Sequence, residues 1–476
     1  MAHELLVGRA EYDGRVTTPT DPFALALAVA NAARGGGGRA LVVGGYVRDQ
    51  LMGRPPKDLD LEVFGIEADA LPGLLAGLGR VEPVGRAFPV YKLGPIDVAL
   101  PRRESKSGRG HTAFTVQGDP HMSFEDAARR RDFTINAISW DPLTGDYVDP
   151  FNGRADIAAR RLRVVDPRSF GDDSLRVLRA LQFAARFDAT LDDEATAICR
   201  AIALDDLPAE RLWGEFEKLL LVAERPSIGF ALARTLGVVE QILPEMLPLY
   251  DCPQDPEWHP EGDVWIHTLM VIDEARRRNA DLARPPLAAI MLSAVCHDLG
   301  KPATTAIIDG RWRSPGHEAA GVAPATTLLD RFNVNSIDGY DVRRQVLAIT
   351  AEHLRPSAFF KAQDTVRDGA FRRLALRVDL ELLVRFGRAD CHGRSGVFDC
   401  SAMDWFLERA RALGVEHAPP KPLLLGRHLK DLGVAPGPRM GEILRAVYER
   451  QLDGSVTTLD EAIAAGRLLV AGAAPV

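Results

Sequence analysis

The sequence predicts an α/β head with a mixed sheet and helices, followed by an all-α neck, body and tail. Between positions 39 and 155, short apolar runs such as ALVV, LDLEVF and PIDVAL alternate with turn residues and short helical stretches, a pattern typical of mixed strands and helices. From about Arg160, apolar residues recur every three or four positions in successive segments, which predicts amphipathic helices. A chain of 476 residues is long enough for about two to four domains.

Five segments are expected along the chain. Residues 1–38 end in ARGGGGR, which predicts an extension with a flexible glycine linker. A proline-rich break at HAPPKPLLLG introduces a small helical tail. The expected boundaries are 39–155 for the head, 156–250 for the neck, 251–408 for the body and 409–476 for the tail.

The composition indicates a soluble, cytoplasmic protein. No apolar run reaches the roughly 20 residues that span a bilayer, so no membrane contact is expected. A net charge of −8 requires that any contact with nucleic acid come from a local basic patch. The cysteines form no CxxC pair, and we expect reduced thiols rather than a disulfide framework; they are Cys199, Cys252, Cys296, Cys391 and Cys400.

The stretch LVVGGYVRDQLMGRPPKDLD predicts a strand, a glycine turn, a short helix and a second strand. Backbone amides at a turn such as Gly44-Gly45 favour an anionic phosphate, although a bare glycine pair is also compatible with a simple tight connection. The following KDLDLEVF alternates strictly, which places Asp58, Asp60 and Glu62 on one face of a strand. Hard oxygen ligands in this arrangement suit Mg²⁺.

A third carboxylate and two basic segments strengthen this interpretation. Asp97 lies in the strand-like run PIDVAL, and three carboxylates on neighbouring strands make a two-metal phosphoryl-transfer centre plausible, whereas isolated pairs are often merely solvated. The segment PRRESKSGRGHTAF predicts a basic loop suited to triphosphate or RNA, or an ordinary surface loop; its basic residues are Arg102, Arg103, Lys106 and Arg109. In RRRDFTINAISWD, we expect ribose and phosphate contacts from Arg131, Asp132 and Asn136.

GGYVRDQLMGRPPKDLDL and RRRDFTINAISWDP together resemble the signature pair of the class II tRNA nucleotidyltransferase and bacterial poly(A) polymerase superfamily, which transfers nucleotides from ATP or CTP to RNA 3′ ends. The resemblance continues into FGDDSLRVLRALQFAARF and ERLWGEFEKLL. It implies a nucleotidyltransferase head in which Asp58 and Asp60 hold Mg²⁺ and Asp97 supports them. It also implies that Gly44, Gly45 and Arg48 cradle the triphosphate, and that the partners are the tRNA 3′ end, ATP and CTP.

The segment DDSLRVLRA carries a candidate template for the base. A carboxylate at Asp173 accepts from an exocyclic amine, and the Arg176 guanidinium donates to a ring nitrogen, so the pair would take cytosine and adenine but not uracil or guanine. The alternative is a helix cap with an i,i+3 ion pair. The superfamily motif is Glu-Asp-x-x-Arg, whereas this chain has Asp172 in place of the glutamate. Full CCA addition, A- or CC-addition and poly(A) synthesis therefore stay open; Arg179 completes the predicted nucleotide-binding set.

The body carries a second set of polar residues on apolar helices. A lone histidine there is usually a core residue, but the H…HD…H…H…D series resembles an HD-type phosphohydrolase domain. We call the predicted ligands the HD site: His267, His297, Asp298, His317, His353 and Asp390. Imidazole and carboxylate ligands suit Ni²⁺, Mn²⁺, Fe²⁺ or Zn²⁺, with Mg²⁺ also possible; His259 and His392 are expected at the surface or beside the ligands.

The two resemblances together imply a bacterial CCA-adding enzyme whose HD domain hydrolyses phosphates at nucleotide ends, including 2′,3′-cyclic phosphates. A regulatory HD hydrolase with a nucleotide-sensing head is the more distant alternative, and the intact Asp-x-Asp pair argues against it. The sequence leaves the oligomeric state open.

Overall fold

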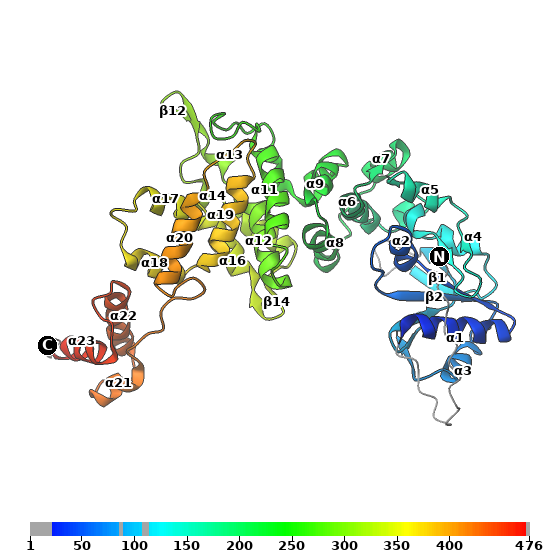
Figure 1. Cartoon of the computed structure of the whole chain (residues 1–476), viewed down its shortest axis with the longest axis horizontal. Coiled ribbons are helices and arrows are strands. Elements are labelled where there is room, and N and C mark those ends of the chain that lie inside the picture. The colour runs from blue at the N-terminus through cyan, green and yellow to red at the C-terminus, as the bar shows by residue number, and fades with distance from the viewer. Residues whose placement is uncertain (1–20, 85–88, 107–113, 473–476) are drawn as a thin grey trace, which may run out of the picture. The chain divides into compact units, whose positions relative to one another are not determined.

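The computed structural model describes residues 21–84, 89–106 and 114–472. The chain forms two compact units (Figure 1). The N-terminal unit runs to Ala180 and includes Phe187–Leu207, whereas the C-terminal unit comprises Leu181–Arg186 and Pro208–Val476. In the described part of the chain, no helix has the length and apolar character needed to cross a membrane.

A seven-stranded mixed sheet forms the centre of the N-terminal unit, as predicted. Strands β2 and β5 pair in parallel, and the other neighbouring pairs are antiparallel. In spatial order, the strands are β3 (Val81–Val84), β4 (Val90–Leu93), β5 (Ile96–Ala99), β2 (Leu59–Phe64), β1 (Arg39–Val43), β8 (Ser139–Trp140) and β9 (Tyr147–Val148).

The head begins earlier than the sequence predicted, with helix α1 (Pro22–Gly35). Its buried face, which includes Leu25 and Val29, belongs to the same hydrophobic core as strands β1, β2 and β5. The glycines after α1 form a tight connection rather than a flexible linker. A Cβ on Gly38 would lie 2.4 Å from the Phe64 carbonyl oxygen, so only glycine allows this close approach.

The other head helices are short: α2 (Gly45–Leu51), α3 (Leu71–Ala76), α4 (Phe124–Arg129) and α5 (Gly153–Ala158). The first part of the predicted basic loop lies in strand β6 (Arg102–Lys106), which pairs with β7 (Phe114–Gly118). Arg103 in β6 bonds to Asp119 at 2.8 Å, whereas Arg109 lies outside the described residues.

Part of the predicted neck packs with the head. The segments concerned are β10 (Arg161–Leu162), η2 (Phe170–Asp172), the first half of α6 (Leu175–Phe187), β11 (Thr190–Leu191) and α7 (Asp193–Arg200). Parallel pairing of β10 with β11 joins two of these segments, and a bridge between Val164 and Phe133, which directly precedes η1 (Thr134–Asn136), connects them to the predicted head. These contacts join residues that are distant in sequence. Helical periodicity reflects only local spacing, so it misplaced the boundary between the head and the neck.

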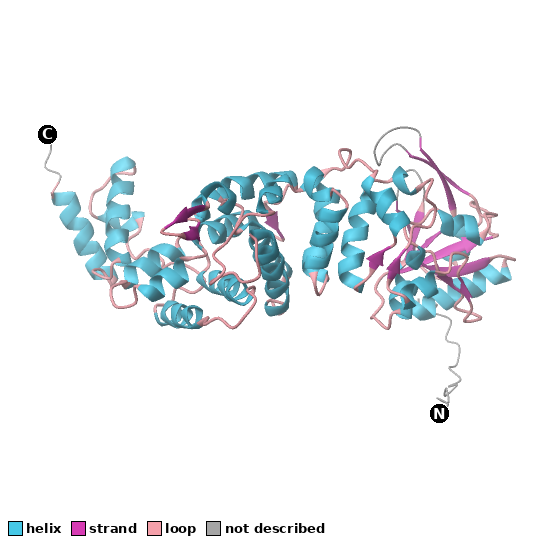
Figure 2. Ribbon diagram, turned by 90° about the horizontal axis from the view of Figure 1, so that it is seen from above, coloured by secondary structure: helices cyan, strands magenta, loops and turns pink. Residues whose placement is uncertain are grey.

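The C-terminal unit is helical, as predicted (Figure 2). Its centre is α12 (Arg284–Cys296), and every residue from 287 to 300 is buried. Helices α8 (Ala209–Val222), α11 (Val264–Arg278), α16 (Val342–Glu352) and α19 (Leu380–His392) pack against it. The other helices of the body are α9 (Pro226–Thr235), α10 (Val238–Ile242), η3 (Pro244–Leu249), α13 (Lys301–Thr304), α14 (His317–Ala320), α15 (Val322–Arg331), α17 (Arg355–Lys361), α18 (Asp368–Ala375) and α20 (Ser401–Ala412). Two small hairpins join them, β12 (Ala306–Ile308) with β13 (Arg311–Arg313), and β14 (Ser336–Ile337) with β15 (Tyr340–Asp341).

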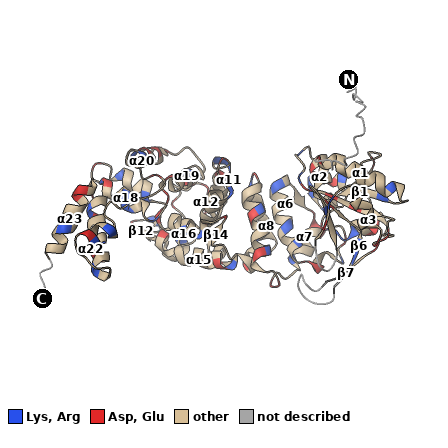
Figure 3. Ribbon diagram, turned by 90° about the horizontal axis from the view of Figure 1, so that it is seen from below, with Lys and Arg blue, Asp and Glu red and all other residues tan. Residues whose placement is uncertain are grey.

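The tail follows the predicted proline-rich break and has a small core of its own. It consists of α21 (Gly426–Asp431), α22 (Pro438–Leu452) and α23 (Leu459–Ala471). Arg373 on α18 bonds to Asp453 at 2.6 Å and to Glu449 at 3.0 Å, which connects the body to the tail. Both basic and acidic residues are scattered over the helices of the two units (Figure 3), and the net charge is −8.

The prediction of reduced thiols is wrong for one pair of cysteines. Cys391 at the end of α19 forms a disulfide with Cys400, which directly precedes α20. The contact between these two helices brings the Cα atoms within 6.1 Å, a separation that a disulfide can bridge. The other three, Cys199, Cys252 and Cys296, are buried free thiols.

Candidate active sites

The head site consists of the predicted carboxylates Asp58, Asp60 and Asp97. Parallel pairing of β2 with β5 places Asp60 directly beside Asp97, and Asp58 lies immediately before β2. Burial, together with the negative charge of Asp97, raises the pKa of Asp60 to about 6. Closely spaced oxygen ligands that disfavour each other's ionisation fit a hard divalent cation such as Mg²⁺.

Glu62 is a residue to which sequence reasoning assigned no role. It lies on the same strand as Asp60, and its buried carboxylate bonds to Arg130 and, at 3.3 Å, to Arg131. Burial lowers the pKa of Arg131, and Glu62 acts in the opposite direction. Glu62 therefore holds Arg131 next to the predicted metal ligands. The strict alternation of KDLDLEVF, which places Glu62 on the same strand face as Asp60, was the sequence feature that could have identified it.

The glycine turn allows this arginine to approach. Gly44 has a φ of 72°, in the left-handed region, and a Cβ there would lie 3.0 Å from Nη1 of Arg131. Any side chain at this position would be strained and would crowd the guanidinium. The turn thus allows the Arg131 guanidinium to lie close to Gly44. The phosphate contact expected at this turn stays a prediction.

A chain of hydrogen bonds connects four of the predicted nucleotide-binding residues. Arg48 Nη1 donates to Asn136 Oδ1 at 2.7 Å, Asn136 Nδ2 donates to Asp132 Oδ1 at 2.8 Å, and Arg179 Nε donates to Asp132 Oδ2 at 2.6 Å. The Arg48 guanidinium also lies over the Phe187 ring, 4.8 Å from its centroid. In this arrangement, Asp132 and Asn136 orient Arg48 and Arg179, whereas the sequence predicted direct contacts to ribose.

The candidate template residues lie at the start of α6. Asp173 Oδ1 accepts from the Leu175 amide at 3.2 Å, which agrees with the capping role considered from the sequence. Arg176 donates to the carbonyl oxygens of Arg130 at 2.7 Å and Ser169 at 3.1 Å. The structure therefore brings the template arginine against the RRR segment that carries Arg131.

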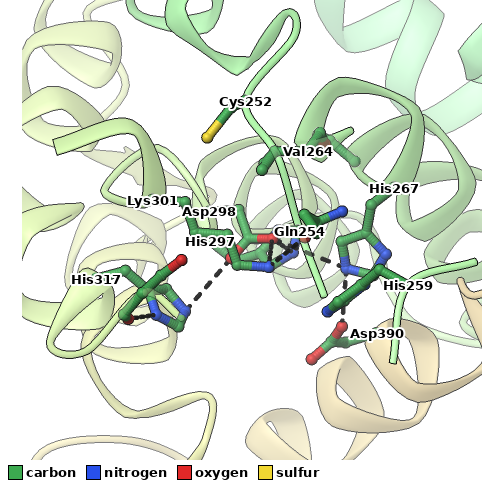
Figure 4. Close-up of polar contacts among 12 residues, drawn as sticks. Cys252, Gln254, His259, Val264, His267, His297, Asp298, Lys301, His317 and Asp390 are labelled. Atoms are coloured by element: carbon green, nitrogen blue, oxygen red, sulfur yellow. Dashed lines mark hydrogen bonds and ion pairs between the residues drawn. The ribbon is translucent and has the colours of Figure 1, made fainter. Parts of the chain in front are cut away.

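The six predicted residues of the HD site converge in the C-terminal unit, and all of them except His353 are labelled in Figure 4. All are buried, and they come from α11, the turn after α12, α14, the end of α16 and α19. His267 Nε2 lies 3.1 Å from Asp390 Oδ1, His297 Nε2 lies 3.1 Å from Asp298 Oδ2, and His317 Nε2 lies 3.2 Å from His353 Nε2.

The imidazoles share one orientation. Nδ1 lies within hydrogen-bonding distance of Ala294 O for His297 (3.1 Å), Ser314 O for His317 (2.8 Å) and Thr350 O for His353 (2.9 Å). A carbonyl oxygen only accepts, so these Nδ1 atoms carry the proton and the Nε2 atoms of the neutral rings present lone pairs to the interior. Metal-ligating histidines have this arrangement.

The charged and polar groups of the HD site also favour the binding of a cation. Both carboxylate oxygens of Asp298 and Nε2 of His297 are buried without a hydrogen bond in the described structure, although Lys301 Nζ lies 2.8 Å from Asp298 Oδ2. Burial alone would raise the pKa of Asp298, but the charge of His297 and His317 in their protonated, metal-free form and the charge of Lys301 hold it well below its usual range. A buried carboxylate facing imidazole lone pairs is a suitable ligand for a divalent transition metal.

Three residues around the HD site had no assigned role in the sequence. Oε1 of the half-buried Glu261 accepts from Nδ1 of His267 and of His259, both at 2.9 Å, which places His259 beside the predicted ligand His267. Lys301 donates to Gln254 Oε1 at 2.7 Å. Glu261 and Gln254 lie in irregular chain, where no periodicity marks a buried position.

Comparisons with known proteins agree with the resemblance to the class II nucleotidyltransferase and poly(A) polymerase superfamily. Residues 40–163 match the family described as the poly A polymerase head domain, and residues 195–249 match the one described as a probable RNA- and SrmB-binding site of polymerase A. The CCA-adding enzyme of Bacillus stearothermophilus in complex with CTP is 21% identical, with a TM-score of 0.59 over 95% of this chain and 100% of that chain. The Thermotoga maritima CCA-adding enzyme complexed with tRNA is 19% identical, with a TM-score of 0.57 over 96% and 97%.

Curated relatives are more similar in sequence. The multifunctional CCA protein of Xanthomonas oryzae pv. oryzae is 39% identical over 75% of this chain and 85% of its own length. That of Xanthomonas euvesicatoria pv. vesicatoria is 37% identical over 85% of this chain and 95% of its own length. This degree of identity over most of both chains shows that the protein belongs to the multifunctional CCA protein family, within the superfamily of class II CCA-adding enzymes and poly(A) polymerases.

Proposed function

We propose that this protein adds C and A nucleotides from CTP and ATP to the 3′ end of tRNA without a nucleic-acid template, and that its HD site catalyses a second, metal-dependent phosphohydrolysis. The observation that carries the first activity is the pairing of Asp60 with Asp97 in one sheet register, next to Arg131 and Gly44. The family membership supports the same activity.

In the head, the tRNA 3′-hydroxyl attacks the α-phosphate and pyrophosphate leaves. Asp58 and Asp60, with Asp97 in support, would hold Mg²⁺, and the bound ion would supply positive charge against the charge that develops on the phosphate oxygens. Arg48 and Arg131 bind the triphosphate, and their orientation by Asn136 and Glu62 reduces the reorganisation needed when the nucleotide enters.

Base selection rests on Asp173 and Arg176. Arg176 is anchored by two backbone carbonyls, so its guanidinium has a defined position from which to donate to a ring nitrogen. Asp172, which stands where the superfamily has glutamate, is one methylene shorter. A- or CC-addition or poly(A) synthesis is therefore the second candidate function.

The test uses tRNA transcripts that end before the first C, after C and after CC, each with one labelled triphosphate. Addition of C to the first two and of A to the third is expected from the wild-type protein. Asp60→Ala should abolish all three. Repeated addition of A alone would favour poly(A) synthesis, and no addition at all would refute the proposal for the head.

The second activity is supported by the buried ligands of the HD site and their uniform orientation. A bound transition metal supplies Lewis-acid polarisation of a phosphate ester. Lys301 adds a positive charge that favours an anionic substrate. We expect release of phosphate from nucleotide ends, including opening of 2′,3′-cyclic phosphates, and loss of this activity in Asp298→Ala.

A further inference from the structure

We propose that Trp258 binds the base of the terminal nucleotide whose phosphate enters the HD site. This inference rests on the proposed phosphohydrolase function and assigns the residue that holds the nucleoside part of its substrate. Trp258 lies in the segment 250–263, which connects η3 to α11 and is called here the η3–α11 loop. Among the described residues of the body, two aromatic side chains are exposed, Trp258 at 51% and Trp312 at 37%.

The burial of the HD site limits which part of a substrate reaches it. Each of the six predicted ligands is at most 8% exposed. The phosphate of a terminal nucleotide projects from the ribose, so it can enter the site while the base stays at the surface. The base then needs a partner at the rim of the site. An exposed aromatic ring suits this role, because every base has a flat face on which such a ring can stack.

Contacts to the HD site on both sides of Trp258 place it at this rim (Figure 4). Before it in the chain, Gln254 Oε1 accepts from Lys301 Nζ at 2.7 Å, and the same Nζ lies 2.8 Å from a carboxylate of the HD site. After it, the imidazole of the adjacent residue His259 packs against that of His267, with 4.7 Å between the ring centroids. Because consecutive Cα atoms are about 3.8 Å apart, Trp258 lies within the reach of a nucleotide bound at the site.

The turn that carries Trp258 has a defined conformation. The backbone amides of Trp258 and His259 both donate to the carbonyl oxygen of Asp255, at 3.0 and 2.8 Å. Arg311 on β13 holds the same turn, since it donates to the carboxylates of Asp255, at 2.6 Å, and of Glu257. A side chain on a preorganised turn loses little freedom when a ligand binds, which favours affinity.

Two basic side chains of the HD site complement this aromatic ring. Lys301 Nζ lies 2.8 Å from Asp298 Oδ2, and Arg394 Nη2 lies 3.9 Å from Asp390 Oδ1. Their positive charges favour the phosphate of a substrate, whereas the exposed indole of Trp258 offers an apolar face. The two chemically different ends of a nucleotide therefore meet two different kinds of group.

Trp312 provides a matched comparison because it lies on the opposite side of its strand. Arg311 contacts the η3–α11 loop, and successive side chains of a strand point to opposite faces. Trp312 therefore points away from the loop, on the face that it shares with its partner Ile307 on β12. Its indole is exposed like that of Trp258 but is not expected to contact a base at the HD site.

The first test compares adenosine 3′-phosphate with glycerol 2-phosphate, since both are phosphate esters of a secondary hydroxyl but only the first carries a base. The full chain is assayed with Mn²⁺. We expect Trp258→Ala to raise KM for adenosine 3′-phosphate by about 5- to 150-fold, the equivalent of one stacked base, with little change in kcat. KM for glycerol 2-phosphate should not change. Trp258→Phe, which keeps an aromatic ring, should restore most of the affinity, and Trp312→Ala should behave like the wild type.

The second test measures base binding without turnover. Adenosine is not consumed and has no phosphate, so its binding does not depend on hydrolysis. We expect adenosine to quench part of the indole fluorescence of the wild-type protein in a saturable manner. Trp258→Phe should remove this part of the quenching, because it removes the indole on which the base stacks, whereas Trp312→Ala should retain it.

The outcomes separate this inference from the proposed function. An equal rise in KM for both phosphate esters in Trp258→Ala would show that Trp258 only supports the loop, and would overturn the inference. Equal quenching by adenosine in the wild type and in Trp258→Phe would also overturn it. If the wild type releases phosphate from neither ester, the proposed phosphohydrolase function fails, and the adenosine titration still decides whether Trp258 binds a base.

Discussion

Glu261 lies at the edge of the HD site, where one carboxylate contacts two imidazoles and a backbone amide. It accepts from His267 Nδ1 and His259 Nδ1 at 2.9 Å, and from the Ser395 amide at 3.2 Å. Because Glu261 accepts from Nδ1 of His267, the Nε2 atom of this ring is left to face the proposed cation position between His267, His297 and Asp298. Glu261 is therefore a positioning residue.

Glu261→Gln should weaken metal binding without removing a ligand. The amide has a single acceptor oxygen, so it cannot accept from all three donors, and loss of such a partner typically lowers metal affinity by about 10–100-fold. Titration with Mn²⁺ of protein that also carries Asp58→Ala and Asp60→Ala, which silence the head site, measures the effect. Glu257→Gln is the matched control, because Glu257 is exposed on the same segment; equal affinity in both variants would contradict the assigned role.

Asp60 makes the stability of the metal-free head depend on pH. Its pKa is about 6 in the folded protein, above the usual value of 3.8. The stabilising contribution of the protonated carboxyl is therefore complete below about pH 4 and is lost as the pH rises through about 6.

We expect Asp60→Asn to gain stability relative to the wild type as the pH rises from 4.5 to 7.5 without divalent cations. Thermal unfolding of both proteins across this range provides the measurement. The exposed Asp69 provides the control Asp69→Asn, which should follow the wild type. Adding Mg²⁺ should reverse the order, because only the carboxylate binds the ion; a constant difference at all pH values would contradict the expectation.

At the scale of elements, helix α1 is part of the head core. Leu25 is fully buried against this core, so Leu25→Ala should lower the free energy of unfolding by about 2–5 kcal/mol. Asn31→Ala on the exposed face of the same helix should cost much less. Urea unfolding of the Leu25→Ala and Asn31→Ala variants measures both free energies of unfolding. Similar small losses for both would indicate that α1 is a dispensable extension, as the glycine run first suggested.

The disulfide between Cys391 and Cys400 closes the loop between α19 and α20. This loop carries Ser395, which contacts Glu261, and Arg394, which lies 3.9 Å from Asp390. In the chain-entropy treatment, closing so short a loop contributes about 2–3 kcal/mol. Reduction should therefore lower the melting temperature and speed the loss of Mn²⁺ from the HD site. Cys391→Ser should reproduce both effects and no longer respond to reductant; unchanged metal retention would contradict a link between the loop and the site.

At the scale of the whole molecule, the two proposed chemistries belong to two separate compact units. The head-site carboxylates lie in the N-terminal unit and the HD ligands in the C-terminal unit. We expect Asp60→Ala to abolish nucleotide addition while sparing phosphate release, and Asp298→Ala to do the reverse. Both activities should be measured on the same preparations. Loss of both activities in Asp298→Ala, with the fold intact by circular dichroism, would contradict this independence.

The residue pattern within single segments was sufficient to predict many of the elements and candidate site residues of this protein. Strict alternation in KDLDLEVF predicted the strand that carries Asp60, and helical spacing predicted the helical C-terminal unit. The H…HD…H…H…D series named the six residues that converge at the HD site. Alternation and periodicity reflect which side of an element is buried, and that information is present in each segment alone.

The tertiary structure decided what depends on contacts between distant segments. The burial of Glu62 between two arginines, of Glu261 beside His267 and of α1 against the sheet each requires a partner far along the chain. The same holds for the Cys391–Cys400 bond, since two helices must first pack together. The sequence by itself determined which residues bring charge and ligand atoms; the packing of distant elements decided which of them face one another, because burial in three dimensions sets the distances that bind a cation.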